Sequence, residues 1–122
     1  MSEFLGAFPQ IFSSPVLAVL LIFGGCSIGI IFGCVPGLTA GIAIALFLPI
    51  TFQMDIIPSF TLLLALYIGG ISGGLISAIL LKIPGTPASV ATVFDGGPMA
   101  DRGEAWKALS VSIVFSFIGT MI

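Results

Sequence analysis

Long uncharged apolar tracts dominate the chain and predict membrane-spanning helices. The first tract, residues 16–35, runs for 20 residues without a charge, which is about the length that spans a hydrocarbon core. The second, residues 56–81, has 26 uncharged residues and can cross a bilayer with some tilt. A third begins near Ala108 and is still apolar at Ile122. We therefore expect an all-α integral membrane protein, and the third tract, cut off in mid-span, suggests a piece of a longer protein.

Each of the first two tracts ends at a Pro-Gly pair that is followed by a short apolar segment. Pro36-Gly37 precedes residues 38–48, and Pro84-Gly85 precedes residues 86–94; both segments are short for a complete span. Proline lacks an N–H and disfavours helix in the residue before it, so the long helices should stop near Val35 and Ile83. The pattern predicts, twice, a long helix, a Pro-Gly break and a short, re-entrant-like half-helix.

The two interrupted tracts resemble each other. Residues 25–42 align with residues 73–90, and the Pro-Gly pairs then coincide. We expect an internal structural repeat, for which the shared break is the main argument because apolar sequences match easily by chance. Paired, interrupted hydrophobic segments are typical of transporter binding sites. The alternative is a pair of proline kinks that bind nothing.

These features divide the chain into five segments. In order, we expect an N-terminal interfacial segment (1–15), a helix–Pro-Gly break–short helix unit (16–52), a second such unit (56–94), a polar loop (95–107) and the truncated start of a further transmembrane helix (108–122). Phe4, Phe8 and Phe12 recur every four residues and favour a helix lying in the membrane interface. An ordinary flexible terminus is the alternative for that segment.

Small residues recur every fourth position in both long tracts. The series are Gly25, Gly29, Gly33, Gly37 and Gly41 in the first tract, and Gly69, Gly73 and Ser77 in the second. Such spacing lets helix backbones approach each other closely. We therefore expect these helices to pack against protein.

Composition excludes several kinds of function. The chain is 58% hydrophobic and 7% charged, with a mean hydropathy of +1.32, whereas soluble domains carry about 25% charged residues. It has no basic cluster that would bind nucleic acid, no P-loop motif and no histidine. Cys26 and Cys34 would lie about 12 Å apart along one helix, too far for a disulfide. We expect no enzyme activity, no cofactor and no metal centre.

The few charges lie mostly in the predicted polar loop, where "DGGPMADRGEAWKA" reads as a turn followed by a helix start at the membrane surface. Lys82 closes the second tract. Its ammonium group could reach the interface, or it could extend toward the loop that follows.

Two long motifs then identify a family. "VPGLTAGIAIALFLPITF" followed by "IPGTPASVATVFDGGPMADRGEAWKAL" resembles the large membrane subunit of the tripartite tricarboxylate transporter family, over roughly residues 24–119. Family members commonly have an aromatic residue where this chain has Gly97. The resemblance implies a multi-pass bacterial inner-membrane secondary transporter that takes up citrate-like carboxylates with a cation gradient. It also implies a periplasmic solute-binding protein, a small membrane subunit and full-length relatives several times longer.

The breaks are the predicted substrate or ion site. Backbone N–H groups at helix starts, together with hydroxyls, suit a carboxylate, and freed carbonyls could coordinate a coupling sodium ion. Asp95 is either a proton or cation partner or a turn-forming residue. The predicted site residues are Gly37, Leu38, Thr39, Ala40, Gly85, Thr86, Pro87, Ala88, Ser89 and Asp95.

A non-transporting membrane scaffold is the competing hypothesis. Its glycine-rich helices would only assemble with partner proteins, so it should tolerate alanine at Thr86 and Ser89, whereas a carrier should lose uptake.

Overall fold

The computed structural model describes residues 6, 9 and 14–122, and these residues contain helices and connecting turns but no strand. The predicted interfacial helix rests on phenylalanines that lie outside the described residues. In chain order the elements are α2 (Pro15–Cys34), α3 (Ala40–Thr51), α4 (Ile56–Leu80), the 3-10 helix η1 (Pro87–Ser89), α5 (Val90–Asp101) and α6 (Ala105–Met121).

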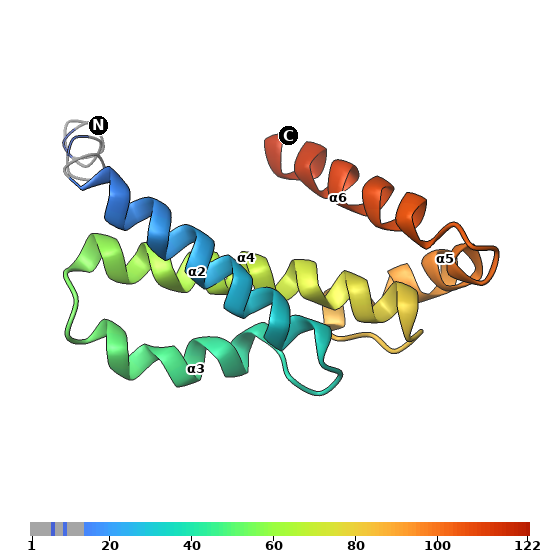
Figure 1. Ribbon diagram of the computed structural model, residues 1–122, viewed down its shortest axis with the longest axis horizontal. Coiled ribbons are helices and arrows are strands. Elements are labelled where there is room, and N and C mark those ends of the chain that lie inside the picture. The colour runs from blue at the N-terminus through green and yellow to red at the C-terminus, as the bar shows by residue number, and fades with distance from the viewer. Residues whose placement is uncertain (1–5, 7–8, 10–13) are drawn as a thin grey trace.

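Helices α2 and α4 form the central pair and run in the same direction (Figure 1). Gly25 of α2 faces Leu62 of α4, whereas Gly33, two turns further along α2, faces Gly70 and Gly74. Both helices therefore advance together along the contact. Their backbones touch because glycine replaces larger side chains at the crossing, and the predicted close packing of these tracts is present in the structure.

Both central helices are long and apolar enough to cross a membrane. They end at Cys34 and Leu80, one and three residues before the positions at which the prolines were expected to end them. Two shorter apolar helices, α3 and α6, accompany them.

Helix α3 returns along α4 in the opposite direction. Its first residue, Ala40, packs on Gly70, and at its other end Thr51 accepts a hydrogen bond through its carbonyl from the Ser59 hydroxyl near the start of α4 (2.9 Å). Between these two points Ala43 packs with α4 leucines in the buried core. A short loop, residues 52–55, joins α3 to α4. The two helices therefore form an antiparallel pair.

The segment after α4 differs from the predicted polar loop. Residues 95–101 belong to α5, residues 102–104 connect the two helices, and α6 starts at Ala105. The physical reason is tertiary packing: Gly96 is buried against the Ile79 side chain, and Gly97 against the Lys82 stem. These contacts override the turn preference of the Asp-Gly-Gly-Pro sequence, and the chain turns later, at Gly103, whose φ is +78°.

The two predicted repeat units have the same order of elements, a long helix, a break and a short helix, but their short helices pack differently. After the first break the 12-residue α3 runs back along α4, whereas after the second the 3-10 turn leads into the 12-residue α5, which packs between the end of α4 and α6. The internal repeat and the re-entrant character of the short helices therefore stay predictions.

Candidate functional site

The two Pro-Gly segments meet on one face of α4. We call residues 35–40 break 1 and residues 81–89 break 2. Ala40, the last residue of break 1, packs on Gly70, and Thr86 of break 2 packs on Gly74 with its Oγ1 2.7 Å from where a Gly74 Cβ would lie. Because Gly70 and Gly74 are four residues apart, the two breaks contact adjacent turns of the same helix.

A direct contact also joins break 2 to α2. The Gly85 backbone lies against the Gly33 carbonyl oxygen at the end of α2 and against the Ser77 hydroxyl of α4. Any side chain at position 85 would collide with these atoms, so glycine is required here for space. We call this meeting point of α2, α4 and both breaks the junction.

The predicted site residues divide by their burial. Ala40 and Thr86 are each 5% exposed and Ser89 is 1% exposed; together with buried Gly85 they lie at or next to the junction. Leu38 and Thr39 are half-buried. The remaining predicted residues, Gly37, Pro87, Ala88 and Asp95, are exposed.

Hydrogen bonds within break 2 hold its turn. The Thr86 amide donates to Ser89 Oγ (3.2 Å), the Thr86 hydroxyl donates to the same oxygen (3.3 Å), and the Ser89 hydroxyl donates to the Thr86 carbonyl (2.8 Å). This is a reciprocal capping arrangement at the start of η1. Both hydroxyl protons are therefore used inside the turn, and the two side chains position its backbone.

Break 1 uses its polar groups differently. The Thr39 carbonyl accepts hydrogen bonds from the amides of Ile42 and Ala43, and the Leu38 amide donates to the Val35 carbonyl. The Thr39 hydroxyl makes no hydrogen bond with any residue that the structure describes. Of the predicted hydroxyls, Thr39 is thus the one whose proton and lone pairs are open to a ligand. Gly37, with φ +94°, supplies the left-handed turn that other residues rarely adopt.

Lys82 is directed away from the junction. Its stem lies over Gly97, and its ammonium group forms an ion pair with Asp101 at the end of α5 (2.7 Å). The sequence allowed Lys82 either to reach the membrane interface or to extend toward the segment that follows, and in the structure it contacts the following segment. Because both partners are half-exposed or more, the pair contributes at most about 1 kcal/mol to stability.

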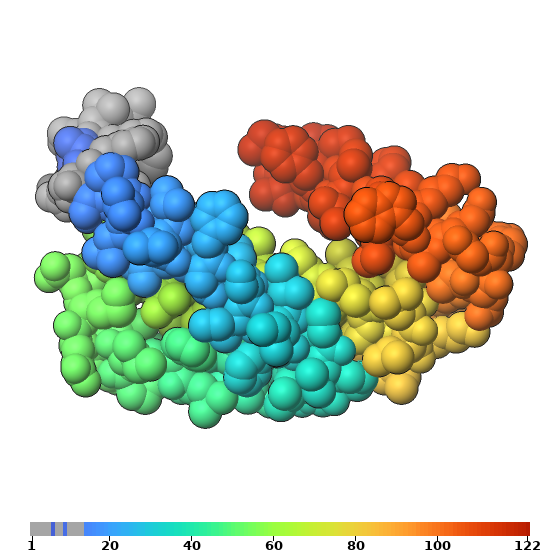
Figure 2. All heavy atoms as spheres, viewed as in Figure 1, coloured from blue at the N-terminus to red at the C-terminus, as the bar shows by residue number. Residues whose placement is uncertain are grey.

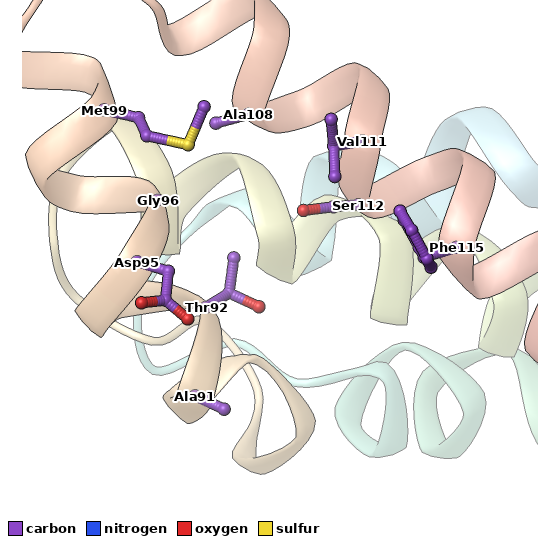
Figure 3. A pocket seen from close by; sticks show the side chains of 9 residues that line it. All are labelled: Ala91, Thr92, Asp95, Gly96, Met99, Ala108, Val111, Ser112 and Phe115. Atoms are coloured by element: carbon purple, nitrogen blue, oxygen red, sulfur yellow. The ribbon is translucent and has the colours of Figure 1, made fainter.

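A cleft lies between α5 and α6, next to break 2 (Figure 3). Its cavity of about 310 Å³ is lined by Asp95, Thr92 and Ser112 together with mostly apolar residues. A second cavity of about 270 Å³ shares Thr92 and Ser112 and reaches Ser89. Sequence reasoning included Ser89 and Asp95 but missed Thr92, Ser112 and Ser116. The four-residue spacing of Ser112 and Ser116 was the available signal.

The helices and the junction define the class of protein: an α-helical membrane protein whose interrupted segments are packed together by glycine. Residues 19–122 match the family described as the tripartite tricarboxylate transporter TctA family. The chain belongs to this family, as its motifs predicted.

Most of the chain is also similar to one curated relative. The chain is 38% identical over 95 residues to an Agrobacterium vitis protein described as an uncharacterized 52.8 kDa protein in the TAR-I ttuC' 3' region. The match covers 78% of this chain and 19% of that protein, so the chain spans about a fifth of the length of this relative. No solved structure matches the chain.

Proposed function

We propose that this chain is part of a secondary active transporter that takes up citrate-like carboxylates across the bacterial inner membrane by cation symport. A periplasmic solute-binding protein would deliver the substrate, and a small membrane subunit would complete the assembly. Family membership supports the substrate class and the partners. Two apolar helices of spanning length support the membrane location.

The observation that carries the proposal is the junction. Two interrupted segments from distant parts of the chain contact adjacent turns of α4 at Gly70 and Gly74. The start of α3 lies at this place, and the amides of a helix start attract a carboxylate through hydrogen bonding and the helix dipole. In this arrangement break 1 provides ligand donors, including the Thr39 hydroxyl and the first amides of α3.

Break 2 has a positioning role in this proposal. Thr86 and Ser89 hold the turn closed through mutual hydrogen bonds, so that buried Gly85 and Thr86 keep their contact with α2 and α4. Loss of one capping side chain costs about 0.5–2 kcal/mol. A loosened turn would misplace the junction without removing a group that binds substrate directly.

Radiolabelled citrate uptake by the intact transporter assembly in proteoliposomes tests the proposal. We expect Thr86→Ala and Ser89→Ala each to reduce uptake about tenfold, the factor that corresponds to about 1.4 kcal/mol. Thr39→Val should reduce it through weaker substrate affinity, because it removes a hydroxyl while keeping the side-chain volume. Uptake would be measured with and without a sodium gradient.

Thr61→Val is the matched control. The Thr61 hydroxyl donates to the Ile57 carbonyl within α4 (2.8 Å), so this variant also loses a hydroxyl hydrogen bond but leaves both breaks intact. Uptake that stays at the wild-type level in all three break variants would contradict the proposal and favour a scaffold role for the breaks.

A further inference from the structure

We infer that the cleft between α5 and α6 is a binding site for a monovalent cation, with Asp95, Thr92 and Ser112 as its oxygen ligands. This inference rests on the proposed function and deepens it, because it gives the driving cation a place separate from the carboxylate site at the junction.

The three oxygen-bearing side chains line one cavity. Asp95 and Thr92 lie three residues apart on α5, which places them on the same face of that helix, and Ser112 comes from α6. Figure 3 shows the Ser112 hydroxyl directed from α6 toward α5, where the Thr92 side chain lies nearer to it and the Asp95 carboxylate lies beyond Thr92. Ligands from two helices are thus available to a small ion between them.

The hydroxyls that line this cleft and the second cavity differ from most other helical hydroxyls of the chain. A helical Ser or Thr commonly donates to the carbonyl four residues earlier. Five side chains do so here: Ser27, Ser59, Thr61, Ser110 and Thr120. Thr92, Ser112 and Ser116 make no hydrogen bond with the residues that the structure describes. Their oxygen lone pairs are therefore open to whatever occupies these two cavities.

The charge of the cleft favours a cation of charge +1. Within the described residues, the three basic side chains pair with Asp101 and Glu104, and Asp95 forms no ion pair. Apolar residues such as Val111 and Phe115 complete the lining, and Asp95 itself is exposed. One carboxylate balances one monovalent cation, whereas a carboxylate substrate would be repelled.

The ligand types and the size of the cavity indicate which kind of cation the cleft would bind. Carboxylate and hydroxyl oxygens are hard ligands that suit hard cations such as sodium. A tightly bound divalent ion would favour a group of three or more His, Cys, Asp or Glu side chains. No such group is present among the described residues. A volume of about 310 Å³ is that of about ten water molecules at about 30 Å³ each. The cation would therefore keep part of its hydration shell.

The second cavity connects this cleft to break 2. It shares Thr92 and Ser112 with the first and is also lined by Ala88 and Ser89, and Ser89 holds the turn of break 2 through its bond to the Thr86 carbonyl. A cation drawn between α5 and α6 would thus lie next to the turn that positions the junction. This adjacency offers a short physical route between cation and carboxylate binding.

Direct binding of radioactive sodium to the purified, intact transporter assembly in detergent tests the inference, with no carboxylate present. We expect saturable sodium binding to the wild type, and an affinity at least tenfold weaker for Asp95→Asn. Thr92→Val and Ser112→Ala should each weaken it several-fold. Asp55→Asn and Ser110→Ala are matched controls, because Asp55 is also without an ion pair among the described residues and the Ser110 hydroxyl bonds to the Trp106 carbonyl; both should bind sodium normally.

Unchanged affinity in Asp95→Asn, or the absence of saturable sodium binding to the wild type, would overturn the inference. Thermal unfolding without sodium would show whether each variant retains its fold. If Asp95→Asn does not fold, Thr92→Val and Ser112→Ala still test the inference independently. Citrate uptake measured on the same preparation separates the two proposals. Sodium binding that depends on Asp95 in an assembly that does not take up carboxylate would support the cation site and reject the proposed function.

Discussion

Gly24 and Gly29, both in α2, have different structural roles. A Cβ added at Gly29 would lie 2.8 Å from the amide nitrogen of Gly70 and 3.0 Å from the Cα of Gly69, whereas a Cβ at Gly24 would have nothing within 4 Å. Backbone atoms cannot rotate away as a flexible side chain can. Gly29 is therefore required by the α2–α4 crossing, and Gly24 is not.

We accordingly expect Gly29→Ala to lower the free energy of unfolding by about 1–3 kcal/mol, the usual cost of overpacking. Gly24→Ala should raise it by up to about 1 kcal/mol, because alanine favours helix. Thermal unfolding of the two variants in the same detergent compares them directly. Equal stabilities would show that the two backbones do not touch at Gly29.

Helix lengths and directions set how the chain crosses the bilayer. At 1.5 Å per residue, α2 is about 30 Å long, α4 about 38 Å and α3 about 18 Å. Because α2 and α4 run in the same direction, the chain from break 1 to the start of α4 has to return to the starting side. Breaks 1 and 2 then lie toward the same side of the membrane.

Labelling of single cysteines by a membrane-impermeant thiol reagent tests this arrangement, in a background with Cys26→Ala and Cys34→Ala. We expect Ser14→Cys and Asp55→Cys to react from one side of the membrane and Lys82→Cys from the other, because all three positions are exposed at helix ends. Reaction of the cysteines at positions 14 and 55 from opposite sides would show that α3 does not return. Reaction of those at 55 and 82 from one side would show that α4 does not span.

At the scale of the whole molecule, α4 joins two groups of helices. Helices α2 and α3 pack on it mainly along its first part, and α5 and α6 pack toward its end (Figure 1). In Figure 2, α6 stands apart from α2 and the surface is hollowed between them. Large apolar side chains are exposed on both groups, among them Phe23 and Phe115. So much exposed apolar surface needs lipid or further protein to cover it.

We expect the chain to stay in the membrane pellet when bacterial membranes are washed with alkaline carbonate, and to be released by detergent. Spanning helices remain in the bilayer when peripheral contacts are lost, because their apolar surface is not accommodated by water. A peripheral membrane protein followed in the same fractions is the control. Release of most of the chain into the carbonate supernatant would contradict a spanning topology.

Several features of the molecule followed directly from the sequence. Low charge and long apolar tracts predicted α2 and α4, because a segment in lipid has to satisfy its backbone hydrogen bonds internally. The Pro-Gly motifs predicted the family, and proline chemistry placed the ends of the long helices within three residues of Cys34 and Leu80. These are local properties, determined by residue type and spacing along the chain.

The tertiary structure decided the rest. The sequence 95–98 has strong turn preferences, yet it is helical because Gly96 and Gly97 pack against α4 and Lys82. The meeting of both breaks at α4, and the cleft that brings Thr92 and Ser112 together, depend on how whole helices are rotated and crossed. That geometry results from contacts between residues far apart in the chain, and no local pattern contains it.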